Sequence, residues 1–327
     1  MSKPNKVAAY PRVSVVIPAL NEARNLAHVF ARLPPDIHEV ILVDGHSVDG
    51  TPEVARQLRP DVRIVTQTRK GKGNALACGF AVATGDVIAM VDADGSADPG
   101  EIPRFVEVLA SGADFAKGTR FAAGGGSADI TRLRRLGNRF LIALVNVCYR
   151  THHSDLCYGF NVFWRHHVPL LCLDASSPPP KNGDGRLWGD GFEVETLIHV
   201  RVAKAGLNVV EVPSFEYSRI HGVSNLSAVS DGLRVLRIIL IERKWSRSRE
   251  RTPVPGRDPG DALAPEQVPE AARPPKLDTE ALDPDGSYQH RLAGDVPEPG
   301  NRDGRPKPNL VQIPAAPAPQ PGLNSQV

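Results

Sequence analysis

Short β-branched runs alternate with helical patterns through the first 120 residues, and this alternation restricts the possible folds more than any other feature of the sequence. VSVVIPA at 13–19 precedes an apolar pattern of helical spacing, and EVILVD at 39–44 precedes the helical pattern of DGTPEVARQL. The same order continues through VRIVTQ, GNALACGFAVA, DVIAMVD, DPGEIPRFVEVLA and ADFAKGT. Repeated strand and helix units form largely parallel sheets with helices on both faces. The sequence therefore predicts an α/β fold with a doubly wound, mostly parallel sheet and flanking helices.

The composition changes near residue 249, which divides the chain. From there to residue 327 the sequence is rich in Pro and Ala, poor in aromatic residues, and without an apolar period of 2 or 3.6. Such a segment cannot bury enough apolar surface to offset the conformational entropy lost on folding. We predict a flexible N-terminus at 1–11, one folded domain at 12–248 and a disordered Pro/Ala-rich tail at 249–327.

Charge and cysteine usage exclude several classes of protein. The formal net charge of +2 is too small to indicate a nucleic-acid partner. The N-terminus has no apolar core of a signal peptide, and the apolar runs at 140–149 and 235–241 are shorter than the roughly 20 residues that span a bilayer. The four cysteines form no CxxC pair. We therefore expect a cytoplasmic protein that binds no nucleic acid.

Two carboxylates follow the apolar strand pattern DVIAMV, at Asp92 and Asp94. Ligands of open α/β sheets bind beyond the carboxyl ends of the strands, where Asn21, Glu22 and Asp44 would also lie. Carboxylates at this spacing can hold a divalent cation such as Mg²⁺ or Mn²⁺ and leave positions free for phosphate oxygens. A cation there would neutralise a departing diphosphate. The alternative is an acidic surface turn without a ligand.

Several ordered motifs resemble those of the family 2 glycosyltransferases, enzymes of the GT-A fold that use nucleotide-activated sugars. The matching segments are VSVVIPALNEARNL, EVILVDGHSVDGT, RKGKGNALACGFAVATGDVIAMVDADGSADP and KGTRF. Later segments are most similar to the polyprenyl-phosphate glycosyltransferases, which include dolichol-phosphate mannose synthase. Arg219, Gly222 and Ser224 match the Arg-x-x-Gly-x-Ser-Lys pattern of that group, whereas Asn225 replaces its Lys.

The resemblance implies two halves of the domain, a nucleotide-sugar half at 12–120 and an acceptor half with amphipathic helices at 121–248. It also implies that Asp92 and Asp94 contact the metal. The side chains that it implies for donor binding are those of Pro18, Asn21, Glu22, Asp44, Lys72, Asp92, Arg219 and Ser224.

Carboxylates in the segment GDGFEVET could supply a general base for sugar transfer with inversion. Asp190 and Glu193 are three residues apart, which would make them neighbours on a helix, and Glu195 is a third carboxylate nearby. We place Asp190 first, because its flanking glycines would let the backbone approach a substrate closely. The alternative is an acid-rich first turn of a helix with no catalytic role.

Two basic, partly apolar segments indicate an anionic acceptor and a membrane surface. Arg132, Arg134, Arg135 and Arg139 precede a continuous apolar run, an arrangement that can bind an anionic head group beside acyl chains. We predict an acceptor-phosphate site formed by Arg120, Arg132 and Arg135. The basic helix near 226–249 predicts peripheral contact with the inner face of the plasma membrane. In the alternative interpretation, both segments are ordinary helices with a solvated and a buried side.

Together these features predict an inverting, metal-dependent glycosyltransferase. It would move a hexose from a donor of the GDP-mannose or UDP-glucose type to a polyprenyl phosphate at the cytoplasmic membrane face. Two alternatives stay open: the same donor chemistry with a soluble hydroxyl acceptor, and a nucleotide-binding module without catalysis.

Overall fold

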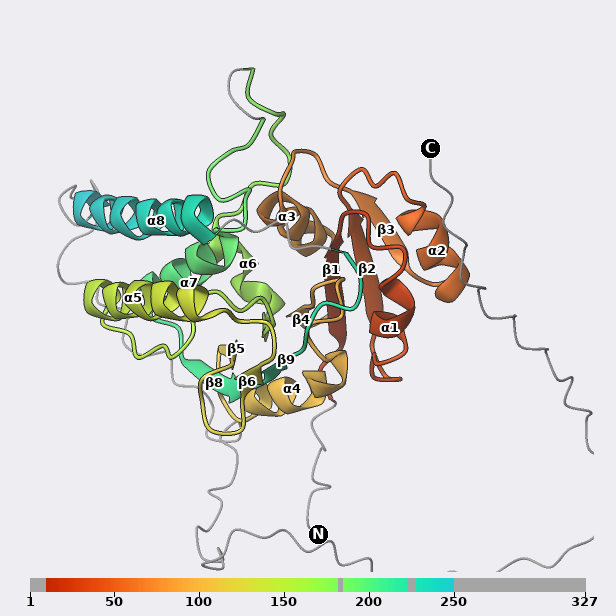
Figure 1. Cartoon of the computed structure of the whole chain (residues 1–327), viewed down its shortest axis with the longest axis horizontal. Coiled ribbons are helices and arrows are strands. Elements are labelled where there is room, and N and C mark those ends of the chain that lie inside the picture. The colour runs from red at the N-terminus through yellow and green to blue at the C-terminus, as the bar shows by residue number, and fades with distance from the viewer. Residues whose placement is uncertain (1–9, 182–184, 223–227, 250–327) are drawn as a thin grey trace, which may run out of the picture. The chain divides into compact units, whose positions relative to one another are not determined.

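The structure is a computed structural model that describes residues 10–181, 185–222 and 228–249 (Figure 1). The tail predicted at 249–327 lies, from residue 250 on, outside the described residues. Residues 1–9 of the predicted flexible N-terminus lie outside them as well.

A seven-stranded sheet forms the centre of the fold, in the order β3-β2-β1-β4-β7-β5-β8. All neighbouring strands are parallel except at β7, which is antiparallel to both β4 and β5. The predicted mostly parallel sheet is therefore confirmed. The strands are β1 (Val13–Ala19), β2 (Glu39–Asp44), β3 (Arg63–Thr66), β4 (Val87–Met90), β5 (Phe115–Thr119), β7 (Asn161–Trp164) and β8 (Val209–Pro213), with a separate parallel pair of β6 (Gly126–Ser127) and β9 (Phe215–Glu216).

Helices cover both faces of the sheet and bury apolar side chains that alternate along each strand. Val15 and Ile17 of β1 face one cluster with helices α1, α2 and α4, whereas Val16 faces the opposite cluster with α3, α6 and α7. These helices are α1 (Leu26–Phe30), α2 (Thr51–Leu58), α3 (Lys72–Val82), α4 (Ile102–Ala110), α6 (Val168–Leu171) and α7 (Val194–Lys204), with 3₁₀ turns at Pro99–Glu101 and Arg165–His167.

Helix α1 is shorter than the pattern after the first strand predicts. Asn21 has a left-handed backbone with φ of 58°, and residues 22–25 form a turn before the helix begins at Leu26. After Phe30 the chain reaches Pro34 and Pro35, which cannot continue a helix. The helical spacing of the apolar residues is therefore realised over only part of the predicted length.

Two long helices, α5 (Arg132–Tyr149) and α8 (Ala228–Arg249), lie side by side and pack on α7 (Figure 1). Buried side chains of the three helices form a third apolar cluster that includes Leu141 and Val145 of α5, Val200 of α7 and Ile239 of α8. Within the described residues, no helix is both long and apolar enough to span a bilayer.

The opposite side of α5 is apolar and exposed to solvent. Leu133, Leu136, Phe140 and Val147 recur at helical spacing and are 67%, 68%, 63% and 76% exposed. We call these four residues the α5 stripe. Leu233 and Leu240 of α8 are also exposed.

Candidate active site

A cavity of about 1220 Å³ extends from the carboxyl ends of β1, β2 and β4 to α5 and α8. It is lined on one side by Pro18, Glu22, Lys72, Asp92, Asp94 and Arg219, among others. On the other side it is lined by Arg120, Arg134, Asn138, Tyr158, Phe192 and Val235, among others. One continuous space thus joins the region predicted for the donor to the region predicted for the acceptor.

The acidic turn after β4 is held by basic side chains. Lys72 lies at the start of α3, and its Nζ is 2.6 Å from an oxygen of Asp92 and 2.6 Å from an oxygen of Glu195. Burial opposes the ammonium charge, but the two carboxylates outweigh it and raise the pKa of Lys72 above its ordinary value. Burial also raises the pKa of Glu195. Lys72 therefore bridges α3, the acidic turn and α7 as a cation.

Arg219 forms a second bridge across the same end of the cavity. Its Nη1 donates to Glu22 at 2.8 Å, and its Nη2 lies 2.9 Å from Asp94. Burial raises the pKa of Glu22, although the bonds from Asn25 and Arg219 oppose that shift. The structure thus brings together Glu22, Asp94 and Arg219 from three separate sequence motifs.

Asn21 and Asp44 brace loops beside the cavity rather than lining it. The side-chain oxygen of Asn21 accepts from the Val48 backbone at 2.9 Å, and Asp44 accepts from the backbones of His46 and Ser47. In this loop Gly45 and His46 line the cavity, and Asp44 does not. Ser224, the last predicted donor residue, lies outside the described residues.

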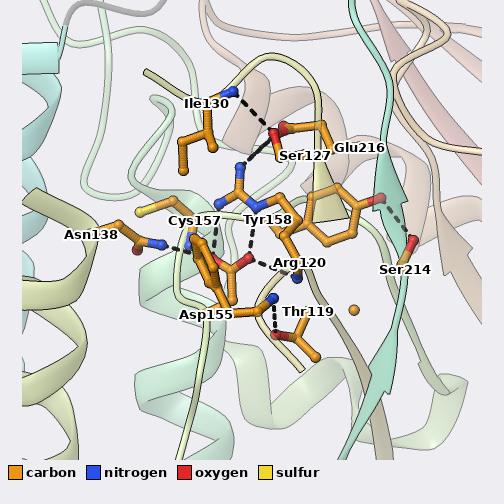
Figure 2. Close-up of polar contacts among 12 residues, drawn as sticks. Thr119, Arg120, Ser127, Ile130, Asn138, Asp155, Cys157, Tyr158, Ser214 and Glu216 are labelled. Atoms are coloured by element: carbon orange, nitrogen blue, oxygen red, sulfur yellow. Dashed lines mark hydrogen bonds and ion pairs between the residues drawn. The ribbon is translucent and has the colours of Figure 1, made fainter. Parts of the chain in front are cut away.

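Arg120 is the centre of a buried charge network at the acceptor end (Figure 2). It donates to both oxygens of Asp155, with Nε at 2.7 Å and Nη2 at 2.9 Å, and to both oxygens of Glu216. Asn138 donates to Asp155 at 3.0 Å, and the Ser127 hydroxyl contacts Glu216. Burial would raise the pKa of Asp155, but the bonds from Arg120 outweigh it and lower that pKa to about 2.

The arginines of α5 divide between the cavity and the exterior. Arg134 lines the cavity, whereas Arg132 and Arg135, which the sequence predicts for the acceptor phosphate, are exposed on other sides of the helix. Successive helical residues are rotated by about 100°, so Arg132 and Arg135 point away from the side on which Leu133 and Arg134 line the cavity. Asn138, one turn after Arg134, faces the same space.

The three carboxylates predicted near α7 lie in different surroundings. The expectation that Asp190 and Glu193 share a helix is wrong, because α7 begins at Val194. In the described structure neither of them lines the cavity, whereas Glu195 does. Asp190 is buried against Arg69, and Glu193 accepts from the Gly191 backbone at 3.2 Å.

Sequence reasoning missed several cavity residues. Arg134 was part of a recognised basic cluster, but the sequence did not show which arginine turns inward. Asn138 and Phe192 lie in segments that stand out only for their charged residues, Tyr158 lies in a segment without a distinctive motif, and Glu216 is the second residue of β9. No signal in a single sequence marks these four, because their place depends on how α5, β9 and the segment before α7 pack together.

Asp92 and Asp94 fit a divalent cation that binds together with a donor. Both carboxylates lie in the cavity, and their oxygens are ligands that Mg²⁺ and Mn²⁺ accept. Two carboxylates are fewer ligands than these cations take, so the remainder would come from diphosphate oxygens and water. Within the described part of the chain, no group of three or more His, Cys, Asp or Glu side chains could hold a metal.

Comparison with known proteins identifies the family. The model of the family described as "Glycosyl transferase family 2" matches residues 14–168. Glycosyltransferase AglJ of Haloferax volcanii is 30% identical over 227 residues, which cover 67% of this chain and 68% of AglJ. A dolichol-phosphate mannosyltransferase of Pyrococcus furiosus is 37% identical over 121 residues, 35% of this chain and 34% of that protein. The chain belongs to family 2 of the glycosyltransferases, and the predicted family is therefore confirmed.

The fold is also that of solved glycosyltransferases. Glucosyl-3-phosphoglycerate synthase from Mycobacterium tuberculosis, solved with Mn²⁺, UDP and glucosyl-3-phosphoglycerate, aligns with a TM-score of 0.53 at 24% identity. The alignment covers 72% of this chain and 81% of that one. This likeness confirms the predicted GT-A fold.

Proposed function

We propose that this glycosyltransferase moves a hexose from a nucleotide sugar to a polyprenyl phosphate at a membrane surface. The observation that carries the proposal is the single cavity with two differently built ends. One end holds paired carboxylates and Arg219, and the other holds Arg120 and Arg134 beneath a helix whose outer side is apolar. Such a cavity suits a donor diphosphate and an acceptor that joins an anionic head to an apolar chain.

The donor end has the groups that a departing diphosphate needs. Asp92 and Asp94 would hold Mg²⁺ or Mn²⁺, which when bound supplies positive charge to the leaving diphosphate. Arg219 lies 2.9 Å from Asp94, so its guanidinium can reach the same phosphate oxygens. Among the relatives, the structure of the phosphoglycerate enzyme contains Mn²⁺ and UDP, which supports a metal with a nucleotide here.

The acceptor end supports a phosphate more directly than a neutral alcohol. Arg120 is bonded to the carboxylates of Asp155 and Glu216, and Glu216 lines the cavity, so a phosphate that displaced the Glu216 carboxylate would meet the guanidinium. Arg134 and Asn138 offer further donors along the same wall. A phosphate is anionic at neutral pH and needs no general base to attack the sugar. The dolichol-phosphate mannosyltransferase among the relatives supports the same class of acceptor.

The outer surface of α5 supports membrane contact. The α5 stripe presents four large exposed apolar side chains, of which Leu133 also borders the cavity, and the exposed Arg132, Arg135 and Arg139 lie beside it on the helix. An apolar strip flanked by basic residues inserts into the boundary between head groups and acyl chains. We therefore place Arg132 and Arg135 at lipid head groups, and Arg120 with Arg134 at the acceptor phosphate.

The test is transfer of label from UDP- and GDP-hexoses, with Mg²⁺ or Mn²⁺, to an added polyprenyl phosphate. Label is expected in the organic phase with one donor, and Asp94→Asn should abolish it. Asp98→Asn is the matched control, because Asp98 accepts from the Gly100 backbone at the turn after the cavity. Donor consumption with all label left in the aqueous phase would overturn the lipid acceptor.

A second candidate is a soluble acceptor with a hydroxyl nucleophile, which would need a base. Glu195 supports it, because this carboxylate lines the cavity and burial raises its pKa. Glu195→Gln separates the two functions. Transfer to a phosphate should continue at a reduced rate, whereas transfer to a hydroxyl should fall about 10²- to 10⁴-fold.

A further inference from the structure

Arg69 and Asp190 form a buried ion pair behind the cavity wall. Arg69 follows β3, and Asp190 lies just before α7, 121 residues further along the chain. The Nε and Nη2 of Arg69 donate to the two carboxylate oxygens of Asp190 at 2.8 and 3.0 Å. The side chains are 0% and 5% exposed. This pair is a bidentate, charge-assisted contact between two segments that both continue into the cavity.

The remaining donors of Arg69 bind the long loop before Asp190. Nη1 donates to the Ser177 carbonyl and Nη2 to the Asp174 carbonyl, both at 2.5 Å. Asp190 Oδ2 also accepts from the Leu187 backbone at 2.7 Å. The Arg69 guanidinium thus binds both the loop near Asp174 and the segment before α7. Arg69 itself directly precedes the sequence KGKG at 70–73, which we call the KGKG turn.

The KGKG turn is pressed against the same segment. The Gly73 backbone donates to the Asp190 carbonyl at 2.8 Å. A Cβ on Gly71 would lie 2.0 Å from the Asp190 carbonyl oxygen, and one on Gly73 would lie 1.8 Å from that of Gly189. These glycines are therefore required for close packing. Lys72, between them, extends into the cavity and contacts Asp92 and Glu195.

We propose that Arg69 and Asp190 are a positioning pair that fixes Lys72 and Glu195 at the diphosphate end of the cavity. Asp190 then acts through Lys72 and is not a general base. Both of its oxygens are already bonded to donors, and its carboxylate does not line the cavity, so it cannot reach an acceptor proton. The inference rests on the proposed function, since it takes the cavity to bind a nucleotide diphosphate.

The experiment measures binding of UDP and GDP with Mn²⁺ to the full chain, without acceptor and well below the unfolding temperature. Asp190→Asn is expected to weaken binding of the preferred nucleotide about 10-fold, which is a common effect of losing a residue that orients a ligand-binding side chain. Lys72→Met should weaken it at least as much. In the Lys72→Met background, Asp190→Asn should add less than about 2-fold, because the coupling runs through Lys72.

A matched variant separates positioning from general loss of stability. Glu242→Gln breaks another buried pair, with Arg201 and Lys204, at residues that do not line the cavity. It is expected to lower the unfolding temperature without changing nucleotide affinity. Equal affinity of wild type and Asp190→Asn, with loss of kcat and of the acidic limb of its pH profile, would overturn the inference in favour of a base. Wild-type binding with the predicted coupling but no sugar transfer would refute the proposed function alone, and absence of any nucleotide binding would refute both.

Discussion

The Arg219 guanidinium lies 2.9 Å from the Asp94 carboxylate, at the position where the sequence predicts a metal ligand. Lys72 contacts Asp92 in the same way at 2.6 Å. Both predicted metal ligands are therefore neutralised by basic side chains. A cation that approaches alone must compete with these charges, whereas a metal with a diphosphate supplies anionic oxygens for the basic groups to bind.

Metal binding should consequently depend on the nucleotide. Mn²⁺ is expected to bind weakly alone and more tightly with UDP or GDP. Arg219→Gln should strengthen binding of Mn²⁺ alone by about 5-fold, on the order of 1 kcal/mol for a partly exposed ion pair, and should weaken binding of the nucleotide. Titration followed by the electron paramagnetic resonance of free Mn²⁺ measures both effects. Arg104→Gln removes the same charge outside the cavity and should change neither the Mn²⁺ affinity nor the nucleotide affinity. An unaltered Mn²⁺ affinity in Arg219→Gln would contradict competition between Arg219 and the metal for Asp94.

The ion pair of Arg120 and Asp155 should cause part of the loss of folding stability at acidic pH. The pKa of Asp155 is lowered to about 2 in the fold, against 3.8 ordinarily. Its contribution to stability is present above pH 4 and is lost as the pH falls toward 2, a difference of about 2 kcal/mol. Asp155→Asn should lower the free energy of unfolding by about 3 kcal/mol at pH 7, and less at lower pH. Urea unfolding across this range tests the prediction, and a gap between the proteins that does not change with pH would contradict it.

The alternation of apolar patterns was sufficient to predict the sheet and the place of the acidic turn. It was not sufficient for β7, because an antiparallel strand inserted between two parallel neighbours leaves the same apolar pattern in the sequence. The short α1 shows a second limit. Its apolar spacing extends further than its backbone hydrogen bonds, which end before Pro34.

The candidate site was predictable where a motif fixes both residue type and place. Asp92, Asp94, Lys72 and Arg219 all line the cavity. Asp190 shows why other residues were not predictable. Its flanking glycines suggested close approach to a substrate, yet the structure uses Gly189 for close approach to the turn that begins α3. Glycines in a sequence indicate that another group packs closely against the backbone, but they do not indicate whether that group is a substrate or another segment of the chain.

Two buried histidines should make the fold less stable below neutral pH. Burial and the nearby Lys117 lower the pKa of His153 to about 4, although Glu211 opposes the shift. Burial, with Lys117 and His153 nearby, also lowers the pKa of His199 well below its ordinary value, and neither of its ring nitrogens has a hydrogen-bond partner among the described residues. The unfolded chain therefore binds more protons than the fold between pH 6.5 and 4, so stability falls as the pH drops through this range.

Replacement of His199 tests this dependence. His199→Leu removes a group whose protonation the fold opposes, so it should be close to neutral at pH 7.5 and stabilising relative to wild type at pH 5. Denaturant unfolding at both pH values measures the change. His38→Gln alters an exposed histidine and should follow the wild type. An equal pH dependence in His199→Leu and wild type would show that the buried ring does not control it.

The α5 stripe should determine membrane binding. Leu136→Gln with Phe140→Gln removes two exposed apolar side chains that the fold does not bury, so the protein should stay folded. The double variant is expected to lose about 2 kcal/mol of partition energy, or about 30-fold, in flotation with vesicles rich in phosphatidylglycerol. Arg135→Gln should cost less, about 1 kcal/mol, and its effect should vanish at high salt because head-group attraction is screened. Val48→Gln is the matched control, because Val48 is 90% exposed but lies in the loop after β2. If it reduces flotation as much as the double variant does, binding is a general consequence of exposed apolar residues and not a property of α5.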